Sequence, residues 1–227
     1  KEQLREEFLF EWIYRKDNFD HEFKSRGRDL GIDILKDRRA FLIKGVDKSR
    51  LNLNCLNDEE YKITISPDIY LILLLNTNDS LVRAKQIVGD LPVKSALGNK
   101  HIIIGKSFSE ARRAVNIMDK IGIRSNVIEF NKVSYIDKIT ELKEDTALIR
   151  ILEELGQTEK GMDLLDTLES FILNDGEVMK ISKELHIHRN SLGYRISRIE
   201  QITGLDPRKY IDLYQLITAY ICYKIKV

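Results

Sequence analysis

The chain has 227 residues, of which 43% are hydrophobic and 32% charged, and its formal net charge is +1. This composition excludes an intrinsically disordered chain and leaves room for one to two globular domains. The longest apolar run, at 69–75, is too short to span a membrane and fits a buried strand. No secretory signal is visible, and the cysteines Cys55 and Cys222 lie far apart, so we expect a cytoplasmic protein with reduced core thiols and no membrane contact.

The first 37 residues predict two helices. Apolar residues recur at helical spacing over 2–14, and a second helical pattern over 19–30 ends at Gly31. We assign residues 1–37 to an N-terminal helical segment. The chain starts with Lys1 instead of Met, inside this helical pattern, so we expect it to be a fragment of a longer protein.

From residue 38 the hydrophobic period changes. Short β-rich runs bounded by turn residues occur at 40–46, 61–65, 69–75, 101–105 and 126–130. Helices are predicted between them at 80–89 and 109–121, the second with Ser109 as its N-cap. This mixed order predicts an α+β domain over 38–130. Residues 131–160 are helical in pattern, charged and free of proline, as expected of a connector.

Two short helical patterns meet at a tight turn within residues 177–201. The apolar positions that recur are Val178, Ile181 and Leu185 in the first pattern and Leu192, Ile196 and Ile199 in the second, with Ile187 pointing inward at the corner. A helix-turn-helix has this form: its first helix braces the second, whose N-terminal residues meet base edges in the major groove. Residues 177–199 hold five basic and two acidic residues, so positive charge is locally concentrated.

Polar side chains occupy the other face of the second helical pattern. They are His188, Arg189, Asn190, Ser191, Tyr194, Arg195 and Arg198. Arginine can pair with guanine and asparagine with adenine, while serine and tyrosine can hold phosphates. Two helices joined by a corner also occur in many folds with a merely solvated outer face, and spacing alone does not separate these interpretations. His186 and His188 are poorly spaced for a metal pair and have no nearby cysteine, so no metal site is expected.

The same region resembles a known family. The string LLDTLESFILNDGEVMKISKELHIHRNSLGYRISRIEQITGLD closely resembles the C-terminal helix-turn-helix of the PucR and CdaR (sugar-diacid regulator) transcription factors. The matching elements are Thr167-Leu168, Asn174-Asp175-Gly176, residues 185–199 and Thr203-Gly204-Leu205-Asp206, with departures at Ser182 and Ser191. The resemblance implies an all-α DNA-binding domain over 161–227. A final apolar stripe from Tyr210 to Ile221, capped by Asp206, is expected to pack under it.

A second, weaker likeness covers the mixed region. Residues 25–43 resemble the segment that precedes the degenerate GGDEF-like domain of CdaR-type regulators, which has the palm-like fold of diguanylate cyclases. The signature hairpin position reads Ser66-Pro67-Asp68-Ile69-Tyr70, and the strand-end carboxylate position is Gly45, two residues before Asp47. Phosphoryl transfer needs metal-binding carboxylates, which Ile69 cannot supply. We therefore expect a palm-like domain without enzymatic activity or cofactor.

The resemblance implies a DNA-binding transcriptional regulator that controls carbohydrate-diacid or related catabolic genes. We expect double-stranded DNA and a second copy of the chain as partners, since one such motif contacts only a few base pairs. A small-molecule effector would bind a domain upstream of Lys1. The alternative is a nucleotide- or metabolite-binding palm-like domain whose helical tail is secondary.

Overall fold

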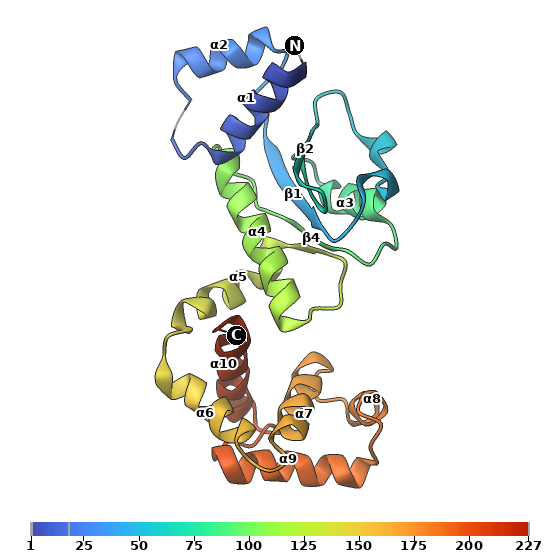
Figure 1. The fold of residues 1–227 in the computed structure, drawn as a ribbon, viewed down its shortest axis with the longest axis vertical. Coiled ribbons are helices and arrows are strands. Elements are labelled where there is room, and N and C mark those ends of the chain that lie inside the picture. Colours follow the sequence, from blue (N-terminus) through green and yellow to red (C-terminus); the bar gives the residue numbers. More distant parts are fainter. Residues whose placement is uncertain (1, 18, 227) are drawn as a thin grey trace. The chain divides into compact units, whose positions relative to one another are not determined.

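The computed structural model describes residues 2–17 and 19–226. The chain divides into two compact units, Lys1–Asp137 and Lys138–Val227 (Figure 1), here called unit 1 and unit 2. Unit 1 combines a five-stranded sheet with helices, and unit 2 is built from helices. This confirms the expected order of a mixed α and β region followed by an all-α region.

The sheet of unit 1 is mixed. Its strands are β1 (Arg38–Lys44), β2 (Tyr61–Ser66), β3 (Ile69–Leu75), β4 (Lys94–Leu97) and β5 (Val127–Glu129). They lie in the order β2-β3-β1-β4-β5, with β4 and β5 parallel and the other neighbours antiparallel. The central strands β1 and β3 are apolar along most of their length because both faces of the sheet are covered.

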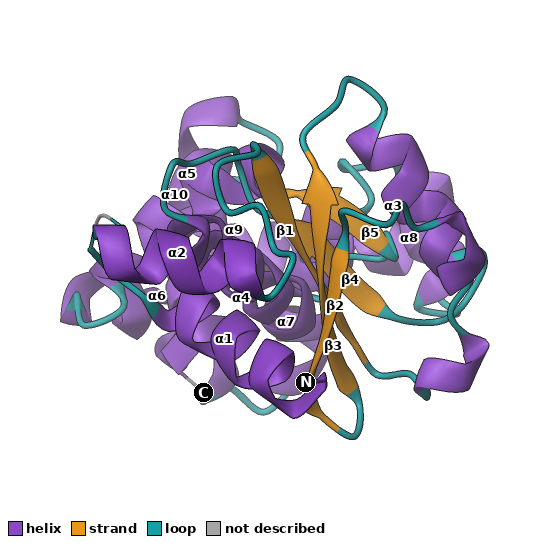
Figure 2. Ribbon diagram, turned by 90° about the horizontal axis from the view of Figure 1, so that it is seen from above, coloured by secondary structure: helices purple, strands orange, loops and turns teal. Residues whose placement is uncertain are grey.

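Helices lie on both faces of this sheet. They are α1 (Glu2–Tyr14), α2 (His21–Asp29), α3 (Ser80–Val88) and α4 (Ile104–Ile121), with short 3₁₀ turns at Lys48–Arg50 and Leu53–Cys55. Helix α5 (Phe130–Ile139) follows β5 and ends in unit 2. Figure 2 shows α1, α2 and α4 on one side of the sheet and α3 on the other. Phe8, Trp12 and Ile13 of α1 are buried, and α1 contacts α4 and β2, so the N-terminal helix contributes to the core of unit 1.

The prediction for residues 101–121 was wrong at its start. The expected strand at 101–105 is absent from the described residues, and α4 begins at Ile104, so Ser109 lies inside the helix and caps nothing. The β-branched run before α4 mimics a strand, but a tertiary contact decides the structure. The buried Ser107 hydroxyl accepts a hydrogen bond from the Ala40 N–H of β1 at 2.9 Å. Gly98 permits this approach, because a Cβ there would lie 2.0 Å from the Ser107 carbonyl oxygen.

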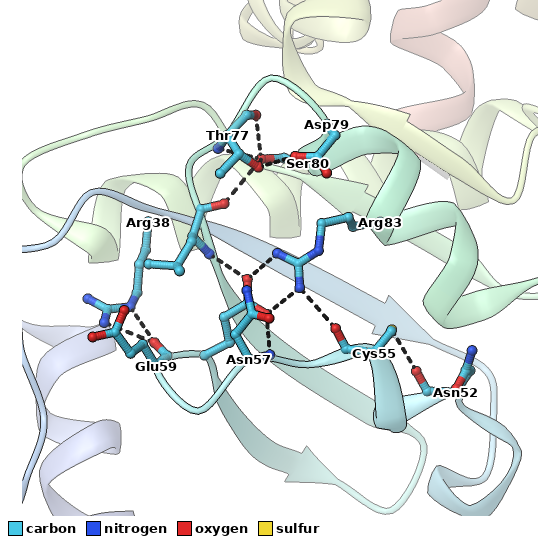
Figure 3. A network of polar contacts seen from close by, with 11 residues as sticks. Arg38, Asn52, Cys55, Asn57, Glu59, Thr77, Asp79, Ser80 and Arg83 are labelled. Atoms are coloured by element: carbon cyan, nitrogen blue, oxygen red, sulfur yellow. Dashed lines mark hydrogen bonds and ion pairs between the residues drawn. The ribbon is translucent and has the colours of Figure 1, made fainter.

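A buried ion pair joins the loop before β2 to helix α3. The carboxylate of Glu60 accepts hydrogen bonds from both terminal nitrogens of Arg83 at 2.5 Å and from the N–H groups of Asn57 and Leu75. Figure 3 shows the contacts around Arg83, which also donates to the Cys55 carbonyl. Burial alone would raise the pKa of the Glu60 carboxyl, but these hydrogen bonds and the Arg83 charge outweigh it and hold the pKa below its usual value.

Unit 2 consists of helices packed against one another. Its elements are the 3₁₀ turn Thr140–Leu142 and the helices α6 (Thr146–Gly156), α7 (Gly161–Leu173), α8 (Val178–Glu184), α9 (Arg189–Thr203) and α10 (Tyr210–Lys226). Helix α6 lies in the region expected to be a connector, yet it packs against α7, α9 and α10 and buries Ile149, Leu152 and Leu155. Helix α10 begins four residues after the expected cap, because Asp206 instead closes a turn by accepting the N–H of Arg208.

The two expected helices of the helix-turn-helix are confirmed as α8 and α9. Their apolar faces meet in a cluster formed by Phe171, Ile181, Leu192 and Ile196. His186 adopts a left-handed conformation, with φ of 53°, and the Ile187 N–H then donates to the Ser182 carbonyl at 3.0 Å. This closure of α8 turns the chain sharply into α9.

The cysteines are both free, but their surroundings differ. Cys222 is buried, and desolvation raises the pKa of its thiol. Cys55 is only partly buried but packs against the core of unit 1, so the expectation of a core thiol holds fully for Cys222 and in part for Cys55.

Candidate DNA-binding helix-turn-helix

His188 fixes the start of α9. It has extended backbone angles, with φ of −70° and ψ of 149°, and its Nδ1 accepts the N–H of Asn190 at 3.2 Å. The His188 carbonyl also accepts the N–H of Leu192, which opens the helical ladder. His188 therefore acts as the N-cap of α9. The side chains that follow it in the first turn take no part in this capping hydrogen bond.

The first turns of α9 expose polar side chains that have no partner within the protein. Arg189, Asn190, Ser191 and Tyr194 are all exposed, Tyr194 by 63% of its surface. None of these four side chains forms a hydrogen bond or ion pair within residues 2–17 and 19–226. Polar groups without internal partners are available to bind a ligand, and here Asn190, Ser191 and Tyr194 line one groove while Arg189 lies on another edge of the helix.

The two remaining arginines are engaged. Arg195 Nη2 lies 2.9 Å from Asp163 Oδ2 of α7, and its Nη1 points toward the Thr167 hydroxyl at 3.4 Å. Arg198 donates to the Gln201 side-chain oxygen at 3.1 Å and stays exposed. Arg195 thus differs from its neighbours, because part of its charge is compensated by α7 before any ligand binds.

The predicted residues divide between two hollows beside α9. A groove of about 670 Å³ is lined on the α9 side by Asn190, Ser191, Tyr194, Arg195 and Arg198. Arg189 lines a separate hollow of about 420 Å³, whose wall includes Val178, Gly193 and Tyr210. The structure therefore brings five of the seven predicted residues to one groove, with His188 at the helix start and Arg189 on the other edge.

The opposite wall of the larger groove was missed by the sequence analysis. It is formed by Thr158, Glu159 and Lys160, in the turn between α6 and α7, together with Asp163 and Leu164 at the start of α7. Lys160 and Glu159 are exposed, and neither forms an ion pair with any other described residue. Helical periodicity could not reveal them, because only the packing of α7 on α9 places this turn beside the groove.

In unit 1 the expected cyclase positions are occupied by groups engaged in local turns. The Gly45 N–H donates to the Asp68 carbonyl at 2.9 Å, so the end of β1 does lie beside the β2–β3 hairpin. Asp68 accepts from the Ser66 hydroxyl, and Asp47 accepts from the N–H and hydroxyl of Ser49. Across residues 2–17 and 19–226, no group of three or more His, Cys, Asp or Glu side chains is arranged to hold a metal ion.

No helix in the described part of the chain has the length and apolar character required to cross a membrane. This agrees with the short apolar runs of the sequence.

Comparisons with known proteins agree with the geometry of α8 and α9. Residues 164–221 match the family of PucR C-terminal helix-turn-helix domains. The proline-responsive transcriptional activator PutR of Bacillus subtilis is 27% identical over 69% of this chain and 44% of its own length. The carbohydrate diacid regulator of Escherichia coli is 24% identical over 96% of this chain and 65% of its own length. The transcriptional activator PmfR of Paenarthrobacter nicotinovorans is 25% identical over 82% of this chain and 40% of its own length.

A solved structure, the regulator of polyketide synthase expression from Bifidobacterium adolescentis, aligns with 99% of this chain and 94% of its own at 18% identity. Its TM-score of 0.39 is too low to support an argument about the fold. The chain spans about 40–65% of the length of the three named relatives. The helix-turn-helix geometry and the matched segment show that this chain carries a PucR-type C-terminal helix-turn-helix domain, and the chain as a whole is similar to transcriptional regulators of the CdaR/PucR type.

Proposed function

We propose that this chain binds double-stranded DNA through α9 and acts as the DNA-binding part of a transcriptional regulator. The observation that supports this most directly is the set of exposed, unpartnered polar side chains on the first turns of α9. Arg189 and Asn190 lie in the first turn, where a recognition helix meets base edges. Ser191, Tyr194 and Arg198 line the same groove as Asn190, where hydroxyl and guanidinium groups can meet phosphates.

In this proposal the seven residues play different roles. Arg189 and Asn190 read bases, His188 sets the helix start beside the DNA backbone, and Arg198 binds phosphate. Arg195 lines the same groove while paired with Asp163, so it holds α9 against α7 and presents a partly compensated charge to DNA.

The test uses DNA sites selected from a random duplex library by the wild-type chain. Replacing Arg189 or Asn190 by Ala is expected to cost roughly 1–3 kcal/mol on a selected site and much less on random DNA. Arg150→Ala serves as the control, since Arg150 is an exposed arginine of α6 with no ion pair to another described residue. Equal losses on both kinds of DNA would show that Arg189 and Asn190 contact only phosphates, and no binding by the wild type would refute the function.

We further propose that the regulator works as a homodimer on two half-sites separated by about 34–36 Å, or one helical turn. Its effector would be a small metabolite, such as a sugar diacid, bound outside this chain, and its targets carbohydrate-diacid or related catabolic genes. We place its action in the cytoplasm, where bacterial DNA is accessible. Sedimentation of the chain with a two-site duplex, compared with a one-site duplex, measures the stoichiometry.

For unit 1 we propose a palm-like, GGDEF-like domain over 38–130 without catalytic activity. The segments 1–37 and 131–160 would flank it, and 161–227 would carry the DNA contacts. This is supported by the hydrogen bond between Gly45 and Asp68 and by the local engagement of Asp47. The purified chain incubated with GTP and Mg²⁺ should form no cyclic dinucleotide, and GTP should not raise its Tm. Turnover lost in Asp47→Asn or Asp68→Asn would instead favour the nucleotide-binding alternative.

A further inference from the structure

The groove beside α9 has two walls of different origin. One wall is the proposed DNA-contacting side of α9, and the other is the turn between α6 and α7. Figure 1 shows this connection running next to α9 within unit 2. The turn residues 157–160 lie outside the segment 164–221 that matches the helix-turn-helix family.

The groove is polar and has more positive than negative charge. Its cations are Lys160, Arg195 and Arg198, and its acids are Glu159 and Asp163. Asp163 is already paired with Arg195, so Glu159 is the one acid of the lining without an ion-pair partner among the described residues. Lys160 and the two arginines therefore favour an anion, and the hydroxyls across the groove can donate hydrogen bonds to it.

Geometry indicates which anion would lie there. A helix inserted in the major groove, which is about 12 Å wide, is flanked on each side by a sugar-phosphate backbone. An element that stands beside the recognition helix therefore meets backbone phosphates and not base edges. The turn between α6 and α7 stands in that position relative to α9.

We propose that this turn forms a second DNA-contacting element and that Lys160 binds a backbone phosphate of the strand that borders α9. The proposal rests on the proposed function of α9. Within it, Glu159 opposes binding, because its carboxylate faces the same phosphates across the same groove. Neighbouring residues of one turn thus act on DNA affinity with opposite signs.

The test compares three charge-removing variants, Lys160→Gln, Glu159→Gln and Lys143→Gln. Lys143 is an exposed lysine near the other end of α6 with no ion pair to another described residue, which makes it a matched control. Affinity for the selected and a random duplex is measured by fluorescence anisotropy between roughly 50 and 200 mM salt, the range over which phosphate contacts change affinity most visibly.

Lys160→Gln is expected to weaken binding to both duplexes about five- to tenfold near 0.1 M salt and to reduce the slope of log K against log salt by about 0.9. Glu159→Gln should strengthen binding several-fold, and Lys143→Gln should behave as the wild type. Duplexes with single neutral methylphosphonates then locate the contact. At one flanking position, the wild type should lose affinity while Lys160→Gln loses none.

Two outcomes would overturn the proposal, and they are distinguishable. If Lys160→Gln behaves like Lys143→Gln while the wild type binds DNA in a salt-dependent way, the turn does not touch DNA and the function of α9 stands. If the wild type does not bind duplex DNA at any salt concentration, the function of α9 and this inference fail together. Because both turn residues are exposed, an unchanged Tm in each variant shows that the fold is intact.

Discussion

In unit 1, the buried charged side chains are bound by other groups of the same unit, whereas the start of α9 in unit 2 leaves its polar side chains unbound. Glu60 and Arg83 form a buried ion pair, and the buried Arg38 donates to the carbonyls of Asp33, Lys36 and Glu59. Such groups would be costly to leave unpaired in the interior, so they stabilise the fold and are unavailable to ligands.

This contrast separates charged side chains that stabilise the fold from charged side chains that are available to a ligand. Both units contain arginines, and their number does not distinguish the two roles. The distinction lies in whether the protein itself satisfies the side chain. Arg195 is intermediate, since it lines the groove beside α9 while paired with Asp163.

The largest effect is expected from breaking the buried pair. Glu60→Gln removes the charge that compensates Arg83 and should lower the free energy of unfolding of unit 1 by roughly 3–5 kcal/mol. Trp12 is the single tryptophan of the chain and is buried in unit 1, so its fluorescence during urea unfolding reports this unit. Glu59→Gln is the control, since the Glu59 side chain is 47% exposed, and it should cost about 1 kcal/mol or less. Glu60→Gln should also bind DNA as tightly as the wild type at urea concentrations below the unfolding transition. This result would show that Glu60 stabilises unit 1 and does not contribute to DNA binding.

Acid should destabilise unit 1 through the same carboxylate. The pKa of Glu60 lies below its ordinary value in the folded protein, so its contribution is fully present above the unfolded pKa of about 4.3. That contribution is lost as the pH falls through the folded pKa. Trp12-monitored unfolding should therefore show stability falling below about pH 4.3, with a shallower fall in Glu60→Gln. An identical pH profile in the variant would contradict this role.

Replacing one glycine of α9 by alanine is expected to stabilise unit 2. Gly193 lies in the helix interior, and a Cβ there would meet no atom within 4 Å. Gly193→Ala should therefore raise the stability of unit 2 by about 1 kcal/mol through helix propensity. Gly161→Ala provides the contrast, because its Cβ would lie 2.2 Å from the Gly156 carbonyl oxygen and must destabilise. Thermal unfolding followed by circular dichroism measures both, and a lower Tm in Gly193→Ala would refute the prediction.

The smallest effect concerns the pair between Asp163 and Arg195. Its side chains are 54% and 21% exposed, so a double-mutant cycle with Ala should give a coupling of only about 0.2–1 kcal/mol. Asp163→Ala also leaves Arg195 unpaired, which should strengthen DNA binding modestly while Arg195→Ala weakens it. If anisotropy titrations show higher DNA affinity for Asp163→Ala and lower affinity for Arg195→Ala, Arg195 contacts DNA as well as α7. A loss of affinity in both variants would show that only the orientation of α9 matters.

Local patterns predicted several elements well. The bounds of α1 and β3 match the periodicity, and the apolar spacing of α8 and α9 placed Leu192, Ile196 and Ile199 on the buried side. The start of α4 could not be predicted in this way. It depends on the contact between Gly98 and Ser107, and the hydrogen bond of Ser107 to Ala40 joins residues 67 positions apart.

The candidate site shows the same limit. Residue type and helical period indicated which side chains of α9 face outward, because both depend on neighbours within one helix. The pairing of Arg195 joins residues 32 positions apart, and the turn at 157–160 reaches the groove only through the packing of α7 on α9. Neither contact leaves a periodic signal in the sequence.

The burial of α6 has a consequence for exchanging DNA-binding modules between regulators. The family match begins at residue 164, but Ile149, Leu152 and Leu155 of α6 complete the core on which α9 and α10 rest. A graft cut at the family boundary would expose that core and leave behind Lys160. The side chain of Asp145 caps α6. A chimera joined ahead of Asp145 would therefore include α9 together with the buried residues of α6 on which it packs.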